Sequence, residues 1–297
     1  MFACLNRITV FWPRFAVFAI VIGASLPAQC WGHEKTVVAI YNDTSCENKG
    51  VWRDGIFAIK AMLTKYGYCH HDIAPNEINT SQTLNDSFRM IIFPGGWAGT
   101  YNLNIKQSGF RHLREFVSRG GGFLGICAGA YFACDVVIWK PDANTPEERY
   151  DYPLNLFEGI GKGVVAGIKE WTAPTGCASG ITRGAAMVMV KIDNHILPIG
   201  SSRLRMLYYG GPFFDPLPFG NQPKTVKVIA TYMVPGSPAD GKPAMIYFRY
   251  GKGKVFLSGI HPEISFDDCT LHRDKKTWKF MDAVISMILS CTPHQQH

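Results

Sequence analysis

One short segment carries a side chain that could act as a nucleophile. The segment Gly125-Ile-Cys-Ala-Gly129 lies between an apolar run typical of a strand and a stretch typical of a helix. A reactive side chain on a sharp strand-to-helix turn needs small neighbours, because the backbone there is strained and closely packed. This pattern predicts that Cys127 is a nucleophile at a helix N-terminus and that the N–H of Ala128 is an oxyanion donor. The alternative is a buried cysteine in a glycine-rich turn.

A second segment could supply the base. His261 and Glu263 follow the last strand of a predicted hairpin, in the sequence Ser258-Gly-Ile-His-Pro-Glu263. Residues two apart in an extended segment point the same way, so the carboxylate can reach one side of the imidazole ring. It would fix the tautomer and support an imidazolium, which leaves the other ring nitrogen free to take the thiol proton.

A third segment, Phe93-Pro-Gly-Gly96, follows the strand before the cysteine turn. Gly95 and Gly96 would let backbone N–H groups approach a developing oxyanion with no side chain in the way. An ordinary tight turn is the alternative interpretation.

The elements that would position these segments alternate between strand and helix in the first half of the chain. Apolar runs predict strands, and helical spacing of apolar residues predicts helices. The strands are expected at 36–41, 68–73, 89–93 and 123–126, and the helices at 51–66, 105–118 and 128–138. This alternation predicts an α/β fold with a mostly parallel sheet covered by helices on both faces.

The second half is mostly strand between residues 158 and 258 and is interpreted as a β-rich insertion. Strands are expected at 185–190, 204–209 and 225–233, and a hairpin is expected at 244–248 and 254–258. The ranges 141–153 and 210–223 are predicted to be surface loops, and 271–289 a closing helix. Within the second range, Tyr208 to Asp215 could line a pocket or pack on the sheet.

Taken together, the three segments resemble the class I glutamine amidotransferase-like superfamily. The chain is most similar to the N-terminal domain of eukaryotic biotin–protein ligases and its free-standing bacterial relatives, from about residue 36 to 290. The resemblance implies a flavodoxin-like sandwich and a Cys–His–Glu triad of Cys127, His261 and Glu263. It also implies that Gly95, Gly96 and Ala128 lie near the oxyanion. It does not imply biotin ligation.

One departure from the superfamily concerns the substrate. Glutamine-hydrolysing members commonly place a glutamine four residues after the nucleophile, where it helps to hold substrate, and this chain has Tyr131 there. We therefore expect an amidohydrolase or amidotransferase-like enzyme whose substrate is a small-molecule or peptide amide other than free glutamine. The alternative is a catalytically idle ligand-binding module on the same fold. The sequence predicts no cofactor and no metal site, and it does not indicate an oligomeric state.

The N-terminal residues predict export. Arg7 and Arg14 precede an uncharged run of twelve residues at 15–26, which ends before Pro27-Ala28. This is typical of a secretory signal peptide, and the run is shorter than the roughly 20 residues of a membrane span. We expect a signal peptide at 1–28, a single domain at 29–297, and a periplasmic or secreted location without a stable membrane span after cleavage. An uncleaved anchor is the alternative.

Composition and charge exclude several other classes of protein. The chain of 297 residues is 47% hydrophobic and 18% charged, which excludes a disordered polymer. The net charge of +7 comes without basic runs interleaved with aromatics, so no nucleic-acid partner is predicted.

Nine cysteines in an exported protein permit disulfides. Cys46 and Cys269 are expected at the active-site edge of the sheet, and their pairing is the first choice. Cys30, Cys69 and Cys291 are expected at the opposite edge.

Overall fold

A nine-stranded sheet runs through the computed structural model, which describes residues 37–80, 84, 88–216 and 226–290. Its strand order is β2-β1-β3-β4-β13-β12-β11-β8-β9. The first five strands in this order are parallel, and each later strand is antiparallel to its neighbour. The parallel strands are β1 (Val37–Tyr41), β2 (Cys69–Ile73), β3 (Met90–Phe93), β4 (Gly122–Ile126) and β13 (Gly253–Ser258). The antiparallel strands are β12 (Pro243–Tyr250), β11 (Lys227–Met233), β8 (Ala185–Ile192) and β9 (Arg203–Tyr209).

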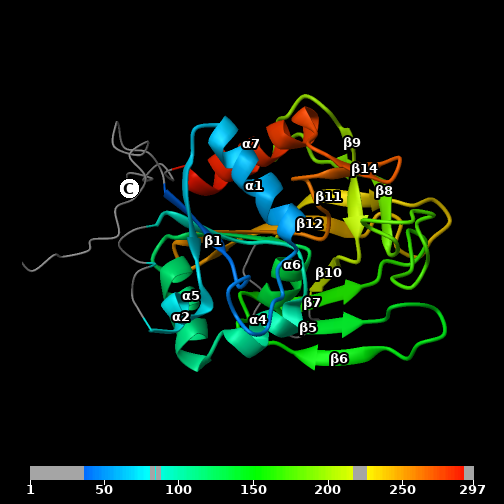
Figure 1. Ribbon diagram of the computed structural model, residues 1–297. Helices are drawn as coiled ribbons and strands as arrows, with labels where there is room; N and C mark the ends of the chain where they lie inside the picture. The colour runs from blue at the N-terminus through cyan, green and yellow to red at the C-terminus, as the bar shows by residue number, and fades with distance from the viewer. Residues whose placement is uncertain (1–36, 81–83, 85–87, 217–225, 291–297) are drawn as a thin grey trace, which may run out of the picture. The chain divides into compact units, whose positions relative to one another are not determined.

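Helices cover both faces of the parallel half, as Figure 1 shows. On one face lie α1 (Arg53–Lys65) and α7 (Lys275–Leu289), and on the other lie α2 (Pro75–Thr80) and α5 (Gln107–Ser118). Alternate residues of β1 pack into two separate hydrophobic cores, because successive side chains of a strand point to opposite faces of the sheet. Val38 and Ile40 join the core beneath α1 and α7, whereas Ala39 and Tyr41 join the core beneath α5.

A second, four-stranded sheet packs beside the α5 face, with the order β10-β7-β5-β6. Its strands are β5 (Cys134–Trp139), β6 (Glu148–Asp151), β7 (Phe157–Gly163) and β10 (Phe213–Pro216). Phe157 of β7 lies 5.7 Å from Phe248 of β12, measured between ring centroids. The short helices α4 (Ala98–Asn104) and α6 (Ala128–Ala133) and the hairpin of β14 (Ser265–Asp267) and β15 (Thr270–His272) complete the described elements.

The predicted fold class, an α/β flavodoxin-like sandwich, is confirmed, and the strands of the second half extend the same sheet. Two helix boundaries were wrong. The helix expected at 128–138 ends at Ala133, because the β-branched run Val136-Val137-Ile138 continues as β5. The helix expected from 271 begins at Lys275, where the carboxylate of Asp274 accepts the N–H of Lys276 at 2.8 Å.

Both predicted surface loops contain a strand. The range 141–153 includes β6 and the range 210–223 includes β10, and both strands pair in the second sheet. Residues 217–223 lie outside the described residues, as does the predicted signal peptide at 1–28. No helix within the described ranges is long and apolar enough to span a membrane.

Candidate active site

Cys127 lies on a sharp turn directly after β4. Its φ of 51° falls in the left-handed region that few non-glycine residues adopt. The glycines on either side are required by close backbone approach. A Cβ on Gly125 would lie 2.5 Å from the carbonyl oxygen of Gly129, and one on Gly129 would lie 2.1 Å from the carbonyl oxygen of Phe93. The small neighbours predicted from the sequence therefore make the strained turn possible.

The helix that follows Cys127 is shorter than expected. It has six residues, and the N–H groups of Ala130 and Tyr131 both donate to the carbonyl of Cys127. A helix of fewer than two turns carries a weaker macrodipole than the expected helix at 128–138 would have had.

His261 and Glu263 follow β13 and form a buried pair. Nδ1 of His261 lies 2.7 Å from Oε1 of Glu263, and the two side chains are 1% and 0% exposed. Two backbone interactions hold the segment. The N–H of His261 donates to the carbonyl of Leu207 in β9 at 2.8 Å, and the indole N–H of Trp278 in α7 donates to the carbonyl of Glu263 at 2.7 Å. The pairing predicted from the His-x-Glu spacing is present.

The electrostatics of this pair favour a charged ring. Burial by itself disfavours the imidazolium, but the negative charges of Glu263 and Cys127 outweigh it and raise the pKa of His261 from 6.5 to about 10. At neutral pH the ring is therefore protonated, and the sulfur of Cys127 is one of the groups that raise its pKa. Such an arrangement stabilises a thiolate and supplies a proton for a departing group.

The thiol of Cys127 and the ring of His261 each have a different hydrogen-bonding state. Sγ of Cys127 donates to the carbonyl of Tyr209 at 3.4 Å. Within the described residues, Nε2 of His261 and Oε2 of Glu263 are buried and have no hydrogen-bond partner. Nε2 of His261 is therefore available to exchange a proton with a reacting group.

The predicted oxyanion residues surround the same point. A Cβ on Gly95 would lie 2.3 Å from Cε1 of His261, so only glycine lets the backbone lie against the ring. Gly96 has a φ of 146°, and a Cβ there would lie 2.0 Å from the carbonyl oxygen of Gly50. Among the described hydrogen bonds, none uses the N–H of Gly96 or of Ala128. Both donors are therefore free for a substrate oxygen.

Tyr131 is buried on α6, and its hydroxyl donates to the carbonyl of Gly210 at 3.1 Å. Burial raises the pKa of this phenol well above its usual value, so it stays neutral. Its ring contacts Trp139 edge to face, with centroids 6.0 Å apart. Tyr131 thus closes the space beside the nucleophile with an aromatic ring.

A cavity of about 830 Å³ opens onto Cys127, Ala128 and Gly96. Its walls are aromatic, and the rings come from segments far apart in the chain. The aromatic residues that line it are Trp97, Tyr131, Trp139, Tyr150, Tyr152, Trp171 and Tyr209. The loop from Tyr208 to Asp215, for which two roles were left open, has both: Tyr209 and Gly210 line the cavity, and Tyr208 is buried, with its hydroxyl oxygen accepting the N–H of Val165 at 2.6 Å.

Sequence reasoning missed Trp52, Trp97, Trp139 and Trp171 as parts of the site. Trp52 contacts the ring of His261 edge to face, with centroids 5.1 Å apart, although its spacing suggested only a helix core. Trp139 lies between the range expected as a helix, 128–138, and the range expected as a loop, 141–153, and Trp97 directly follows Gly96. The position of Trp97 next to the glycine pair was the one available signal.

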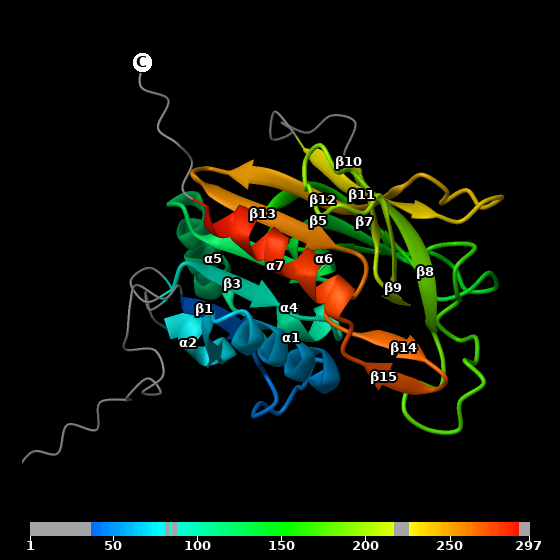
Figure 2. The same ribbon diagram turned by 90° about the horizontal axis from the view of Figure 1, so that it is seen from above.

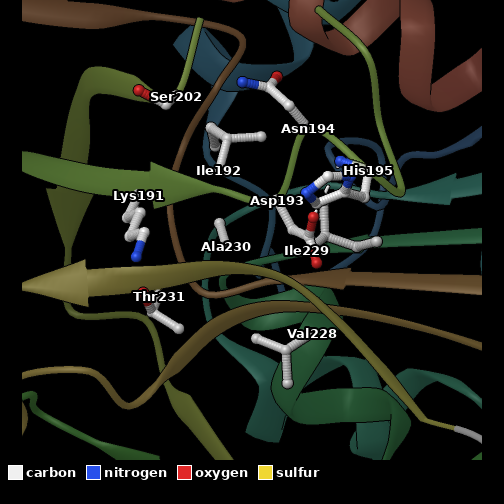
Figure 3. A pocket seen from close by; sticks show the side chains of 10 residues that line it. All are labelled: Lys191, Ile192, Asp193, Asn194, His195, Ser202, Val228, Ile229, Ala230 and Thr231. Atoms are coloured by element: carbon white, nitrogen blue, oxygen red, sulfur yellow. Dashed lines mark hydrogen bonds between the residues drawn. The ribbon is translucent and has the colours of Figure 1, made fainter.

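A second cavity, of about 570 Å³, lies away from these residues (Figure 3). Its lining side chains come from β8, from β11 and from the loop after β8, which carries Asp193 and His195. His195 is exposed, and none of the predicted site residues lines this cavity. In the described ranges no group of three or more His, Cys, Asp or Glu side chains could hold a metal ion.

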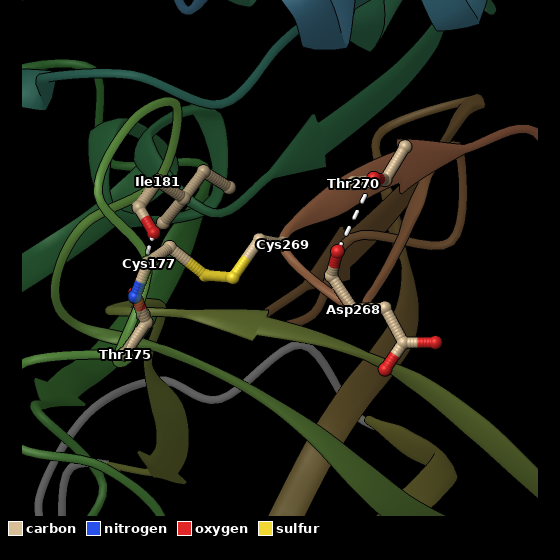
Figure 4. The surroundings of a disulfide bond; sticks show 6 residues. All are labelled: Thr175, Cys177, Ile181, Asp268, Cys269 and Thr270. Carbon is tan, nitrogen blue, oxygen red and sulfur yellow. Dashed lines mark hydrogen bonds between the residues drawn. A yellow bond between two sulfur atoms is a disulfide. The ribbon is translucent and has the colours of Figure 1, made fainter.

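The predicted Cys46–Cys269 disulfide was wrong. Cys46 is a free cysteine, and Cys269 pairs with Cys177, with Cα atoms 5.5 Å apart (Figure 4). The β14–β15 hairpin packs beside β8 and β9, as Figure 2 shows, and this carries Cys269 away from the loop after β1. Cys69 is also disulfide-bonded; Cys30 and Cys291, expected at its edge of the sheet, lie outside the described residues.

Comparison with known proteins places this fold and site in a family. The family model described as "Biotin-protein ligase, N terminal" matches residues 36–295. The chain belongs to this family. It is 30% identical over 196 residues to the biotin–protein ligase of Schizosaccharomyces pombe, which covers 64% of this chain and 28% of the ligase. It is 27% identical over 191 residues to an uncharacterised protein of Chlamydia muridarum, covering 64% of this chain and 66% of that one.

The chain thus spans just over a quarter of the ligase and less than two thirds of both relatives. Among solved structures, PurLQS from Thermotoga maritima is similar, with a TM-score of 0.54 and 13% identity, covering 85% of this chain and 99% of that one. At this identity the likeness concerns the fold alone. It agrees with a class I glutamine amidotransferase-like architecture, the fold expected from the sequence.

Proposed function

We propose that this protein is a cysteine-dependent amidohydrolase or amidotransferase-like enzyme with Cys127 as nucleophile. The observation that carries the proposal is the buried His261–Glu263 pair, 2.7 Å apart, beside a thiol on a strained strand-to-helix turn. Burying a carboxylate and an imidazole together costs desolvation energy, and the ring nitrogen that faces Cys127 has no hydrogen-bond partner among the described residues. A purely structural pair would have no reason to leave that nitrogen unsatisfied.

Each residue of the site has a role in the proposed acyl transfer. The sulfur of Cys127 attacks the amide carbonyl carbon, and the N–H groups of Gly96 and Ala128 stabilise the oxyanion. The protonated ring of His261 gives its proton to the departing nitrogen, and the C–N bond breaks to leave a thioester. Water, deprotonated by the same ring, then hydrolyses the thioester to a carboxylic acid. Glu263 keeps the ring oriented and charged.

Free glutamine is not the proposed substrate. Tyr131 takes the position at which glutamine-hydrolysing relatives in the superfamily place a glutamine, and its hydroxyl is already bonded to the carbonyl of Gly210. The pocket beside the nucleophile therefore presents an aromatic ring where an amide group would hold substrate.

The second candidate function is a catalytically idle ligand-binding module. It is favoured by the hydrogen bond from the Cys127 thiol to the carbonyl of Tyr209, which gives the sulfur a backbone partner other than His261. The two candidates differ in whether the ring activates the thiol.

Competitive alkylation with iodoacetamide, read by mass spectrometry, separates the two candidates. In the enzyme, Cys127 should be labelled faster than the free cysteines Cys46 and Cys134, because burial raises the pKa of both other thiols. His261→Ala should slow the labelling of Cys127 by about 100-fold or more. Labelling of Cys127 that is indifferent to His261→Ala would favour the idle module.

We further propose export to the periplasm or the cell exterior, with residues 1–28 as the cleaved signal peptide. The Cys177–Cys269 disulfide supports this proposal, because disulfides persist in oxidising compartments. N-terminal sequencing of protein from the native host should find a start near Gln29. Chains that keep Met1 in the membrane fraction would instead indicate an anchor.

A further inference from the structure

The cavity beside Cys127 has a continuous aromatic lining. Trp139 contacts Trp97 at 5.8 Å and Trp171 at 5.9 Å, both edge to face, and Trp171 stacks on Tyr209 at 5.1 Å. Trp97 stands at the mouth with 51% of its side chain exposed. Its half-exposed ring is therefore accessible to a ligand in the cavity. Linked edge-to-face rings leave flat slots that accept another ring.

Charges are confined to one strand at the edge of the cavity. Among the described residues that line it, the only charged ones are Glu148, Arg149 and Asp151 of β6, all exposed. Arg149 is already paired with Asp151 at 3.1 Å. A free amino acid would bring an ammonium and a carboxylate into this space without a buried counter-charge for either. Such a ligand would lose hydration without compensation.

The position of His261 decides which part of a substrate lies in the cavity. Cys127, Gly96 and Ala128 line the cavity, whereas His261 does not, and its ring contacts Trp52 edge to face. The departing nitrogen must lie within reach of the ring that protonates it. The oxyanion must lie at the free N–H groups of Gly96 and Ala128. The remaining substituent on the carbonyl carbon, the acyl group, is left to enter the aromatic cavity.

We propose that the cavity is an acyl-group subsite for amides whose acyl side carries a flat aromatic ring. This rests on the proposed function, because it uses the acyl-transfer geometry at Cys127. In the reaction, the ring-bearing acyl group is bonded to sulfur as the C–N bond breaks, and the amine leaves with the proton of His261. Water then releases an arylalkanoic acid and regenerates the thiol.

Chloromethyl ketones test the subsite, since the CH₂Cl group replaces the departing nitrogen and the other side of the ketone occupies the acyl position. Cys127 displaces chloride and forms a stable thioether. Three probes differ only in the acyl side: methyl, cyclohexylmethyl and benzyl. The benzyl probe should label Cys127 about 10- to 100-fold faster than the methyl probe, from burial of the ring. It should exceed the cyclohexylmethyl probe several-fold, from ring–ring contact.

Two exposed aromatic residues give a matched pair of variants. Trp97→Ala removes a ring at the cavity mouth, and Phe57→Ala removes a ring of 53% exposure that lies outside this cavity. Because both side chains are half exposed, both variants should fold. Trp97→Ala should reduce the preference for benzyl over methyl by at least threefold, while Phe57→Ala should leave it unchanged. Phe57→Ala should also leave the rate with the methyl probe at the wild-type value.

The outcomes separate this inference from the proposed function. Equal rates with the methyl and benzyl probes, or equal effects of the two variants, would overturn the aromatic subsite while labelling still depends on His261. Faster labelling by a chloromethyl ketone with the α-amino acid end of glutamine would also overturn it. Labelling of Cys127 that ignores His261→Ala with every probe would instead remove the proposed function itself.

Discussion

The two sides of the candidate site are built in different ways. The reactive side consists of Gly95–Gly96, Cys127 and the His261–Glu263 pair, each directly after a parallel strand of one sheet. The aromatic side draws its rings from α4, α6, β5, β6, β9 and the loop before β8. Reacting atoms therefore rest on neighbouring strands whose register fixes their positions, whereas the surface that would select a ligand comes from loops and a second sheet. The reacting groups need accurate positions for catalysis, whereas the residues that select a ligand can vary in position and type.

The Cys177–Cys269 disulfide joins the two sides, because Cys177 lies in the loop that carries Trp171 and Cys269 lies in the hairpin after Glu263. The pair closes a separation of 92 residues. Cys177→Ser should lower the free energy of unfolding by about 2–4 kcal/mol. Denaturant unfolding under non-reducing conditions measures this loss.

The same variant should also separate the two sides functionally. If the disulfide only holds the aromatic side, Cys177→Ser should weaken the benzyl preference and leave the methyl-probe rate within about twofold. Wild-type protein treated with a mild reductant provides a control without substitution. An equal fall in both rates would mean that the reactive side depends on the loop as well.

Gly95→Ala tests how tightly the reactive side is fitted together. The added Cβ would lie 2.3 Å from Cε1 of His261, so the ring must shift, and a displacement of about 1 Å can cost about 100-fold in rate. Alkylation of Cys127 by the methyl probe should fall by about that factor. The double variant Gly95→Ala/His261→Ala should be no slower than His261→Ala alone, because both changes act through one ring. Additive losses would place the effect of Gly95 elsewhere.

Glu263→Gln should give the smallest loss of labelling, roughly 10-fold at neutral pH, since the carboxylate orients and supports the ring without touching substrate. It should also lower the pKa of His261 from about 10, because the ring loses the negative charge of Glu263 while burial still disfavours the imidazolium. Histidine NMR measures this change directly. A ring that remains protonated at pH 8 in the variant would show that Glu263 is not what holds the charge.

The same shift predicts how stability varies with pH. A group whose pKa is raised on folding stabilises the protein fully below its unfolded value of 6.5, and this contribution is lost as the pH rises towards about 10. The stability advantage of wild type over Glu263→Gln should therefore be largest near pH 6 and shrink through that window. Thermal unfolding at several pH values checks the direction.

The sequence by itself predicted the parallel half of the sheet and named the residues of the proposed reactive side. Each of the three motifs meets a local requirement. Gly-x-Cys-x-Gly permits a strained turn, Pro-Gly-Gly permits close backbone approach, and His-x-Glu places two side chains on the same side of an extended segment. Such requirements are met by neighbouring residues and can be seen in a short window. The structure places Cys127, His261 and Glu263 together because β4 and β13 are adjacent and parallel, so their carboxyl ends meet at one edge.

The tertiary structure alone decided the aromatic side and the disulfide. Trp97, Trp139 and Trp171 look like unrelated core residues in the sequence, since no local period links them. These rings converge because α6 ends after six residues and the chain continues as β5, which pairs in the second sheet. Long-range strand pairing therefore outweighs the local helix propensity of this segment. Cys269 likewise pairs with Cys177 because its hairpin packs on β8 and β9. The spacing of residues along the chain does not indicate which distant segments come into contact.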